Sequence, residues 1–289
     1  MARIARIQTN LAYEDLTYVI HGPESYQLRL FRPEGNGPFP FVVDLHGGAW
    51  NLSDRMSGTM RAESLIPEGV ASASLDFRQG PHGYPTSLQD VNYAIRWLKS
   101  NAQKLRLDPN RVGLVGASSG GHLAMLAAMR PEDGRYSALK SSDLDPAFDA
   151  RVRCVGMVAP VINPLSRYRR AYEAAQGPNP PEWAISMLEK HHVYWTDTAR
   201  MEEGNPLLIL ERNDEAELLP AIYVQGRPDF AHIYVDPDRG GDELEPDRFV
   251  RNYRRRGGEI ELVWIETEEA QSPLLYEPLA TFMKNKLRP

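Results

Sequence analysis

The sequence predicts an α/β protein with a mostly parallel central sheet flanked by helices. Three observations lead to this prediction. Apolar, strand-like segments alternate with segments of helical periodicity, which is the pattern of a parallel sheet with right-handed crossovers. A glycine-flanked serine, in residues 116–120, stands between such a strand and such a helix. Two further glycines, Gly47 and Gly48, directly follow another buried strand.

The first third of the chain supplies a hairpin, two buried strands and an amphipathic helix. Residues 14–32 form two strand-like runs around the turn signal at 21–24. Compact apolar strands are expected at 41–45 and 70–77. Thr86 to Gln89 resembles a capping box and opens a predicted helix that ends near residue 102. Its apolar positions share one face: Leu88, Val91, Ile95, Leu98 and Ala102.

The stretch Gly116-Ala117-Ser118-Ser119-Gly120 carries the strongest chemical signal. An apolar strand precedes it at 112–115 and a helix-like segment follows at 122–129. In so tight a turn the flanking positions must lack bulk, and the serine hydroxyl stays exposed at a helix N-terminus. The helix dipole there favours developing negative charge. Ser118 is therefore a candidate nucleophile, and the alternative is a small-residue turn that happens to contain serine.

The second half resumes the alternation after a long interruption. Residues 162–218, rich in proline turns and helical segments, predict a helical cap insertion of approximately that extent. We see no repeat and no linker, so we expect one domain over residues 1–289. The remaining sheet and helix segments are a strand at 152–161, a strand at 219–224, a helix at 248–255, a strand at 260–265 and a helix at 278–287.

The composition argues against several classes of partner. Acidic residues outnumber basic ones by 39 to 33, a net charge of −6, so no nucleic-acid footprint is evident. The short basic clusters at 167–170 and 254–256 are expected to be solvated helix faces. Cys154 is the only cysteine, and no metal-ligand spacing, dinucleotide motif or P-loop occurs, so we expect no metal and no cofactor. The first residues lack the apolar core of a signal peptide, and no apolar run approaches membrane-spanning length, so we expect a cytoplasmic protein without a membrane partner.

Four motifs in order resemble the α/β-hydrolase fold. They are H-G-G-A-W at 46–50, D-F-R at 76–78, G-A-S-S-G-G at 116–121 and G-R-P-D at 226–229. The set looks most like the hormone-sensitive-lipase-like carboxylesterases and the neighbouring kynurenine-formamidase and feruloyl-esterase-like branch. The resemblance covers roughly residues 25–130 and 215–289. It implies an α/β-hydrolase fold and a carboxylic ester hydrolase acting on a small molecule.

The resemblance also implies roles for individual residues. Ser118 would be the nucleophile and Asp229 the acid that orients the base. The backbone N–H groups of Gly48, Ala49 and Ser119 would form the oxyanion hole. Acyl transfer needs such a set: a nucleophile, a base, an orienting carboxylate and donors for the oxyanion.

One expected residue is absent from its usual place. The family's histidine should follow the last strand, but residues 266–272 contain none, and the last histidine of the chain is His232. His232 is our leading candidate for the base because it lies three residues beyond Asp229. His191 and His192 of the cap come second. The orienting acid would then be Asp229 or Asp236.

Three functions therefore remain open. The chain is expected to be a serine hydrolase of a small carboxylic ester or aryl amide, with an atypical base. The alternatives are a non-hydrolytic enzyme of the same fold, such as a lyase or cyclase, and a ligand-binding protein without catalysis. Trp50, Tyr194 and Trp195 are candidate substrate-binding aromatics, although core packing also explains them. A homodimer is compatible with the sequence but not required by it.

Overall fold

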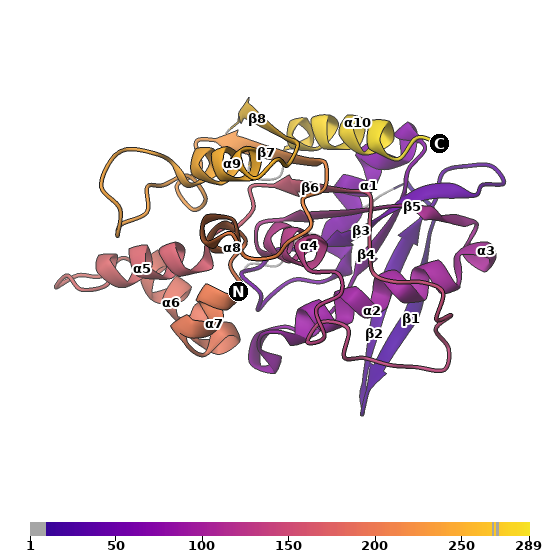
Figure 1. Ribbon diagram of the computed structural model, residues 1–289, viewed down its shortest axis with the longest axis horizontal. Helices are drawn as coiled ribbons and strands as arrows, with labels where there is room; N and C mark the ends of the chain where they lie inside the picture. Colours follow the sequence, from indigo (N-terminus) through magenta and orange to yellow (C-terminus); the bar gives the residue numbers. More distant parts are fainter. Residues whose placement is uncertain (1–9, 268, 270–271) are drawn as a thin grey trace.

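An eight-stranded sheet runs through the molecule in the order β1-β2-β4-β3-β5-β6-β7-β8 (Figure 1). The structure is a computed structural model that describes residues 10–267, 269 and 272–289. Residues 1–9, on which the expectation about a signal peptide rests, lie outside the described residues. The strands are β1 (Tyr13–His21), β2 (Glu24–Phe31), β3 (Phe39–Leu45), β4 (Ala71–Leu75), β5 (Leu107–Ala117), β6 (Cys154–Val158), β7 (Ala221–Arg227) and β8 (Ile260–Glu266).

The strand directions confirm the predicted fold class. β1 pairs with β2 antiparallel around the turn predicted at 21–24, and β2 pairs antiparallel with β4. From β4 to β8 every pairing is parallel. Consecutive residues of a strand point to opposite faces, and both faces are buried here. Val42 of β3 belongs to the core on one face and Val43 to the core on the other.

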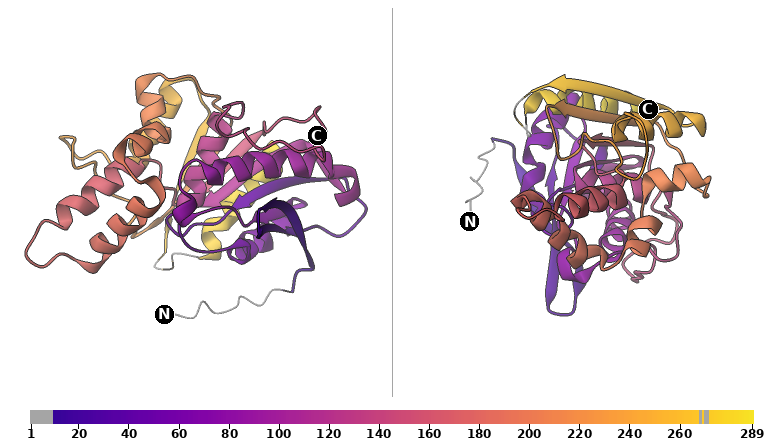
Figure 2. Two further views of the ribbon diagram at one scale, coloured as in Figure 1. Left: turned by 90° about the horizontal axis from the view of Figure 1, so that it is seen from below. Right: turned by 90° about the vertical axis from the view of Figure 1, so that its left-hand side faces the viewer.

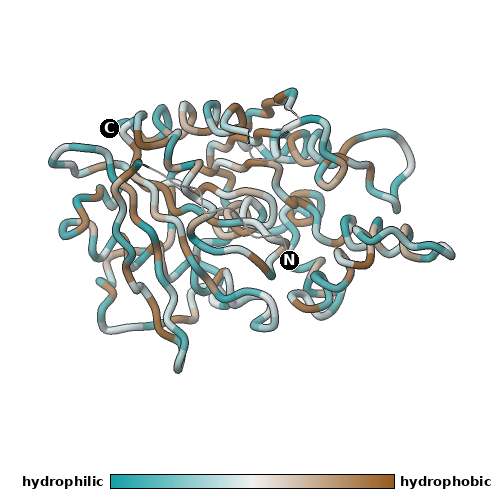
Figure 3. Tube along the Cα trace, turned by 180° about the vertical axis from the view of Figure 1, so that it is seen from behind, coloured by the Kyte–Doolittle hydropathy of each residue, from teal (hydrophilic) through white to brown (hydrophobic). Residues whose placement is uncertain are grey.

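Helices cover both faces of the sheet. α1 and α10 pack on one face, whereas α2, α4, α8 and α9 pack on the other. The helices are α1 (Thr59–Leu65), α2 (Thr86–Ser100), α3 (Ala102–Leu105), α4 (Ser119–Met129), α5 (Pro164–Ala174), α6 (Glu182–Trp195), α7 (Thr198–Glu203), α8 (Pro206–Arg212), α9 (Glu245–Arg255) and α10 (Tyr276–Lys286). In the tube of Figure 3 the hydrophobic colour recurs along the central strands, between these two helical layers.

Two local predictions were wrong. The helix beginning near Thr86 exists, but its N-cap is Pro85, which makes no side-chain cap hydrogen bond. The Thr86 hydroxyl instead donates to the Gly83 carbonyl at 2.7 Å, so the capping box does not form. The strand predicted at 152–161 is shorter, Cys154–Val158. After it the backbone turns at Ala159, whose φ is 42°, and the Val161 N–H donates to the Ser118 carbonyl at 3.1 Å.

The interruption between β6 and β7 consists of four helices. α5, α6 and α7 group at one end of the molecule, beyond the carboxyl ends of the central strands (Figures 1 and 2). α8 packs back against α4 and α9. The helical content of residues 162–218 thus agrees with the prediction, while the role of this insertion as a cap remains a prediction.

Candidate active site

Ser118 lies on the sharp turn between β5 and α4. Its backbone has φ 53° and ψ −121°, a region that residues with a side chain rarely adopt. The turn is held by its N–H, which donates to the Val158 carbonyl at 2.9 Å, and by its own carbonyl, which accepts from Val161 at 3.1 Å. A Cβ at Gly116 would lie 2.4 Å from backbone atoms of Gly120. The strand and the helix can approach this closely only because both positions lack a side chain.

His232 meets Ser118 from the loop after β7. Its Nε2 lies 3.0 Å from Oγ of Ser118, and its Nδ1 lies 2.7 Å from Oδ2 of Asp229. The other carboxylate oxygen of Asp229 accepts the backbone N–H groups of Ala231 at 2.9 Å and of His232 at 3.2 Å. Gln225 at the end of β7 donates a further hydrogen bond to Oδ2 at 3.1 Å. The three side chains form a continuous serine–histidine–aspartate chain of hydrogen bonds.

The electrostatics of this chain favour a charged aspartate. Burial raises the pKa of the Asp229 carboxyl, but the hydrogen bond and charge of His232, with the N–H of Ala231, outweigh burial and lower this pKa. A carboxylate at this position fixes the proton of a neutral His232 on Nδ1. Nε2 is then a free acceptor that faces the Ser118 hydroxyl.

Of the two acids that the sequence proposed for His232, the structure brings only Asp229 to it. Asp236 is turned away and accepts a hydrogen bond from Arg248 at 2.7 Å. Arg248, on α9, is 3% exposed and also pairs with Glu245 at 2.9 Å and Glu211 at 2.8 Å. Burial lowers the pKa of this guanidinium, but the surrounding carboxylates outweigh burial and raise the pKa above its ordinary value.

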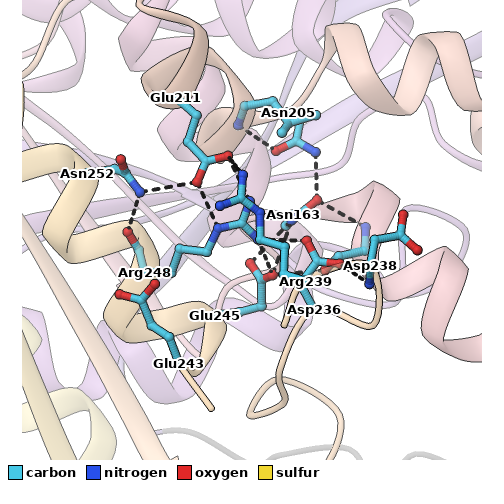
Figure 4. Close-up of polar contacts among 12 residues, drawn as sticks. Asn163, Asn205, Glu211, Asp236, Asp238, Arg239, Glu243, Glu245, Arg248 and Asn252 are labelled. Carbon is cyan, nitrogen blue, oxygen red and sulfur yellow. Dashed lines mark hydrogen bonds and ion pairs between the residues drawn. The ribbon is translucent and has the colours of Figure 1, made fainter. Parts of the chain in front are cut away.

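A buried polar network anchors the loop that carries His232. Figure 4 shows Arg248 at its centre, with acids reaching it from α8, from the loop and from α9 itself. The network extends to α5, because the amide of Asn163 and the hydroxyl of Ser166 donate to Glu245 at 3.2 to 3.3 Å. The loop after β7 is thus tied both to α9 and to the start of α5.

The other candidate bases lie elsewhere. His191 is buried and its Nδ1 hydrogen-bonds to the Met187 carbonyl at 2.8 Å. His192 is exposed and pairs with the Tyr168 hydroxyl at 3.1 Å. His122 accepts from Trp50 Nε1 and donates to Gly204, and burial lowers its pKa to about 4. Within the described residues, His232 is therefore the histidine that reaches Ser118.

The loop after β3 presents backbone donors beside the turn. Gly48 and Ala49 have φ of 97° and 53°, and a Cβ on Gly48 would lie 1.9 Å from the Leu52 carbonyl oxygen. The Trp50 N–H donates to Oγ of Ser119 at 3.1 Å, which joins this loop to the start of α4. In the described part of the chain, the N–H groups of Gly48, Ala49 and Ser119 have no acceptor.

The aromatic candidates require a correction. Trp50, Tyr194 and Trp195 are 1%, 0% and 0% exposed. Trp50 stacks on Tyr194 at 5.7 Å between ring centroids and meets Trp195 edge-on at 5.2 Å. Rings so completely covered by one another leave no face for a substrate, so these residues form a core between α6 and the loop after β3.

Sequence reasoning missed two features of this region. Gln225, which holds Asp229, carried no signal of its own inside a strand. Arg167 was assigned to a solvated helix face, but it is 4% exposed, and the prediction was wrong for this residue. The spacing of α5 could have revealed it, since Arg167 lies one turn after Asn163 and one turn before Ala171, which are both buried.

The described residues form neither a metal-binding cluster nor a membrane-spanning helix. No group of three or more His, Cys, Asp or Glu side chains is arranged to hold a metal ion among them. None of their helices combines the length and the apolar character that crossing a bilayer requires. Residues 268, 270 and 271, part of the stretch where the family's usual histidine was sought, lie outside the described residues.

The chain is similar to known esterases over its first half. Residues 28–163 match the family described as BD-FAE. Esterase LipC of Mycobacterium tuberculosis (strain ATCC 25618 / H37Rv) is 34% identical over 121 residues, which cover 41% of this chain and 30% of LipC. Carboxylesterase NlhH of the same strain is 30% identical over 142 residues, covering 46% of this chain and 44% of NlhH. The match thus spans less than half the length of these curated relatives.

Solved structures resemble the whole chain. The thermophilic carboxylesterase EstE1, cloned from a metagenomic library, superposes with a TM-score of 0.72 at 20% identity, over 99% of this chain and 92% of EstE1. The Pyrobaculum calidifontis esterase gives 0.70 at 20% identity, over 95% and 85% of the two chains. Residues 28–163 are therefore similar to the BD-FAE family, and the whole chain has the α/β-hydrolase fold.

Proposed function

We propose that this chain is a serine hydrolase of small carboxylic esters or aryl amides. The observation that carries the proposal is the hydrogen-bond chain from Ser118 through His232 to Asp229, with spacings of 3.0 and 2.7 Å. A serine hydroxyl alone is a weak nucleophile, and a base within hydrogen-bond reach activates it. His232 would supply this base from a position different from that of the related esterases.

The proposed reaction has two halves. In the first, Oγ of Ser118 attacks the ester carbonyl while Nε2 of His232 accepts the hydroxyl proton. The tetrahedral oxyanion is held by the N–H groups of Gly48, Ala49 and Ser119. The intermediate collapses, the C–O bond to the alcohol breaks, and His232 returns the proton to the departing alcohol. In the second, water attacks the acyl-enzyme with His232 again as base, and a carboxylic acid leaves.

The similarity to named esterases and carboxylesterases supports hydrolysis over the other two functions. A lyase, a cyclase or a pure binding protein has less need for a serine, a base and free backbone donors around one point. Asp229, kept charged, would stabilise the imidazolium that forms during the attack. The cytoplasmic location and the homodimer stay predictions.

Hydrolysis of p-nitrophenyl acetate by the wild type, Ser118→Ala and His232→Ala tests the proposal. We expect each variant to lose about a thousandfold or more in kcat, because a triad missing one member works little better than the bare site. His192→Ala is the matched control, since this exposed histidine pairs with Tyr168, and its turnover should equal that of the wild type.

Two results would contradict the proposal in different ways. Full turnover in His232→Ala together with lost turnover in His192→Ala would indicate that His192, in the insertion, is the base. Failure of the wild type to exceed Ser118→Ala over a panel of short-chain and aryl esters would leave the lyase, cyclase or binding alternatives.

A further inference from the structure

A buried arginine without a partner lies beside the proposed site. Arg167 of α5 is 4% exposed, and its Nε and Nη2 atoms are fully covered without a hydrogen bond. Within the described part of the chain, the guanidinium takes part in no hydrogen bond or ion pair. The guanidinium carbon lies 5.3 Å from the ring centroid of Trp50.

This arrangement is unlike that of the other buried arginines. Arg61 pairs with Asp44 at 2.7 Å, and Arg248 pairs with three acids. A buried charge is costly unless a partner of opposite charge and hydrogen bonds compensate it. Burial lowers the pKa of Arg167 to about 10, which still leaves it charged at neutral pH. A cation–π contact with Trp50 offsets only part of this cost.

The groups around Arg167 leave its charge uncompensated. Tyr234 and His191 are neutral at neutral pH, because burial raises the pKa of the phenol and lowers that of the imidazole. Asp229 attracts Arg167, but His232, Ala231 and Gln225 already bind its carboxylate. Arg170 adds a second positive charge nearby.

Arg167 is enclosed by the same segments that build the reaction centre. Trp50 directly follows the donors Gly48 and Ala49 in the loop after β3. The segment that leads into α5 is tied to the turn, because Val161 donates to the Ser118 carbonyl at 3.1 Å. On the third side, the hydroxyl of Ser166 is 3.3 Å from that of Tyr234, two residues after His232. Arg167 is thus close enough to the reaction centre for the charge of Asp229 to act on it.

We propose that Arg167 binds a carboxylate of the substrate, so that the preferred substrates are esters with a second, ionised carboxyl group. This inference rests on the proposed hydrolase function and names the substrate class of that site. A guanidinium offers parallel donors in a planar fork that matches a carboxylate. The carboxylate would supply the missing charge and an acceptor for Nη1, the guanidinium nitrogen that is not among the fully covered ones. Arg167 would then be a specificity-determining residue, remote from the bond that breaks.

Matched ester pairs test this proposal on both sides of the ester bond. On the acyl side, mono(4-nitrophenyl) glutarate is compared with 4-nitrophenyl valerate, which has a neutral acyl chain of the same length. On the alcohol side, 4-acetoxybenzoate is compared with 4-methylphenyl acetate. We expect the wild type to favour the anionic member of at least one pair by about tenfold in kcat/KM, the scale of one charge-assisted hydrogen bond.

The decisive variant is Arg167→Met, which keeps the length of the side chain and removes its charge. It should lower kcat/KM for the preferred anionic ester by about 10- to 100-fold, mainly through KM, and change its neutral partner less than about twofold. Arg167→Lys keeps a charge but lacks the planar fork, so its kcat/KM for the anionic ester should lie between those of the wild type and Arg167→Met. Arg200→Met removes an exposed arginine of α7 and should leave both members of the pair unchanged.

The possible failures are distinguishable. A wild type that prefers both neutral esters, or an Arg167→Met variant that loses both members of a pair equally, overturns the carboxylate site and leaves the hydrolase function standing. If the wild type hydrolyses no ester faster than Ser118→Ala does, the hydrolase function itself is wrong. If Arg167→Met does not fold, inhibition of wild-type 4-nitrophenyl acetate hydrolysis decides. Glutarate should then compete with this substrate and glutaramide should not, and equal effects of the two would reject the site.

Discussion

Ser118 and His232 face each other at the carboxyl edge of the sheet, but the segments that carry them are held in different ways. The turn around Ser118 is fixed by its backbone: glycines at contact points, a left-handed φ and main-chain hydrogen bonds. The loop around His232 is fixed by side chains, above all by Arg248 and the acids that surround it. The turn at Ser118 has no room for a side chain at its glycines, whereas the loop around His232 needs the buried charge of Arg248 to keep its acidic partners. Substitutions should therefore damage the two halves by different mechanisms.

The largest expected effect is that of Asp229→Asn. The backbone N–H groups of Ala231 and His232 would keep their hydrogen bonds to the side-chain oxygen of the new asparagine. Its amide nitrogen would then face Nδ1 of His232. His232 would then carry its proton on Nε2 and could not accept one from Ser118. We expect kcat for p-nitrophenyl acetate to fall by about 10³- to 10⁴-fold with little change in stability.

Asp236→Asn is the matched control for that experiment, because this acid pairs with Arg248 and not with His232. It should lower the midpoint of urea unfolding while most of the turnover of the folded protein remains. A loss of turnover as large as that of Asp229→Asn would show that Asp236 orients the base.

Gly120→Ala tests the backbone support of Ser118. An added Cβ would lie 2.1 Å from the Leu45 carbonyl oxygen and 2.4 Å from that of His46, so β3 and α4 would have to move apart. Backbone atoms cannot yield as a flexible side chain does, and we expect a loss of about 4 kcal/mol or more in the free energy of unfolding. Gly134→Ala, where nothing lies within 4 Å of the added atom, should be neutral. A stable, active Gly120→Ala protein would contradict the close approach.

This difference also explains how much the sequence could predict. The turn at Ser118 was predictable because its requirements are local: glycines at fixed spacing between a strand and a helix. His232 could be proposed because it is three residues from Asp229, although the spacing said nothing about its distance from Ser118. The Arg248 contacts join residues 12 and 37 positions apart, and no local pattern encodes such pairs. Arg167 was missed because clustered arginines on a helix resemble a solvated face.

Arg248→Met tests the side-chain support of His232. Removing the cation leaves Asp236, Glu245 and Glu211 close together without their common partner. Breaking a buried pair of this kind costs about 3 to 5 kcal/mol, which equilibrium unfolding in urea would measure. Turnover of the remaining folded protein should fall as well, because the loop that carries His232 loses an anchor.

Arg251→Met is the control on the same helix. Arg251 is exposed and pairs with Glu243 at 2.6 Å, so its loss should cost about 1 kcal/mol or less. If Arg248→Met were as mild, side-chain pairing would not be what holds the loop, and the contrast with the Ser118 turn would be lost.

Glu245→Gln gives the smallest effect and separates the two supports by pH. Burial raises the pKa of Glu245 to about 7, with Arg248 opposing and Asp236 adding to the shift. The folded protein therefore keeps this proton to higher pH than the unfolded chain, whose reference value is 4.5. Between these values the unfolded state binds fewer protons, so the free energy of unfolding falls as the pH rises.

Glutamine at position 245 has no proton to release. Relative to Glu245→Gln, the wild type should lose up to about 3 kcal/mol of unfolding free energy between about pH 4.5 and pH 8. Unfolding curves of both proteins across this range would measure the difference, and parallel pH dependences would contradict it. The turn at Ser118 is held by main-chain contacts that do not titrate, so Gly120→Ala should shift the stability curve by the same amount at every pH. A pH-dependent cost is thus expected only where side-chain charge holds the site.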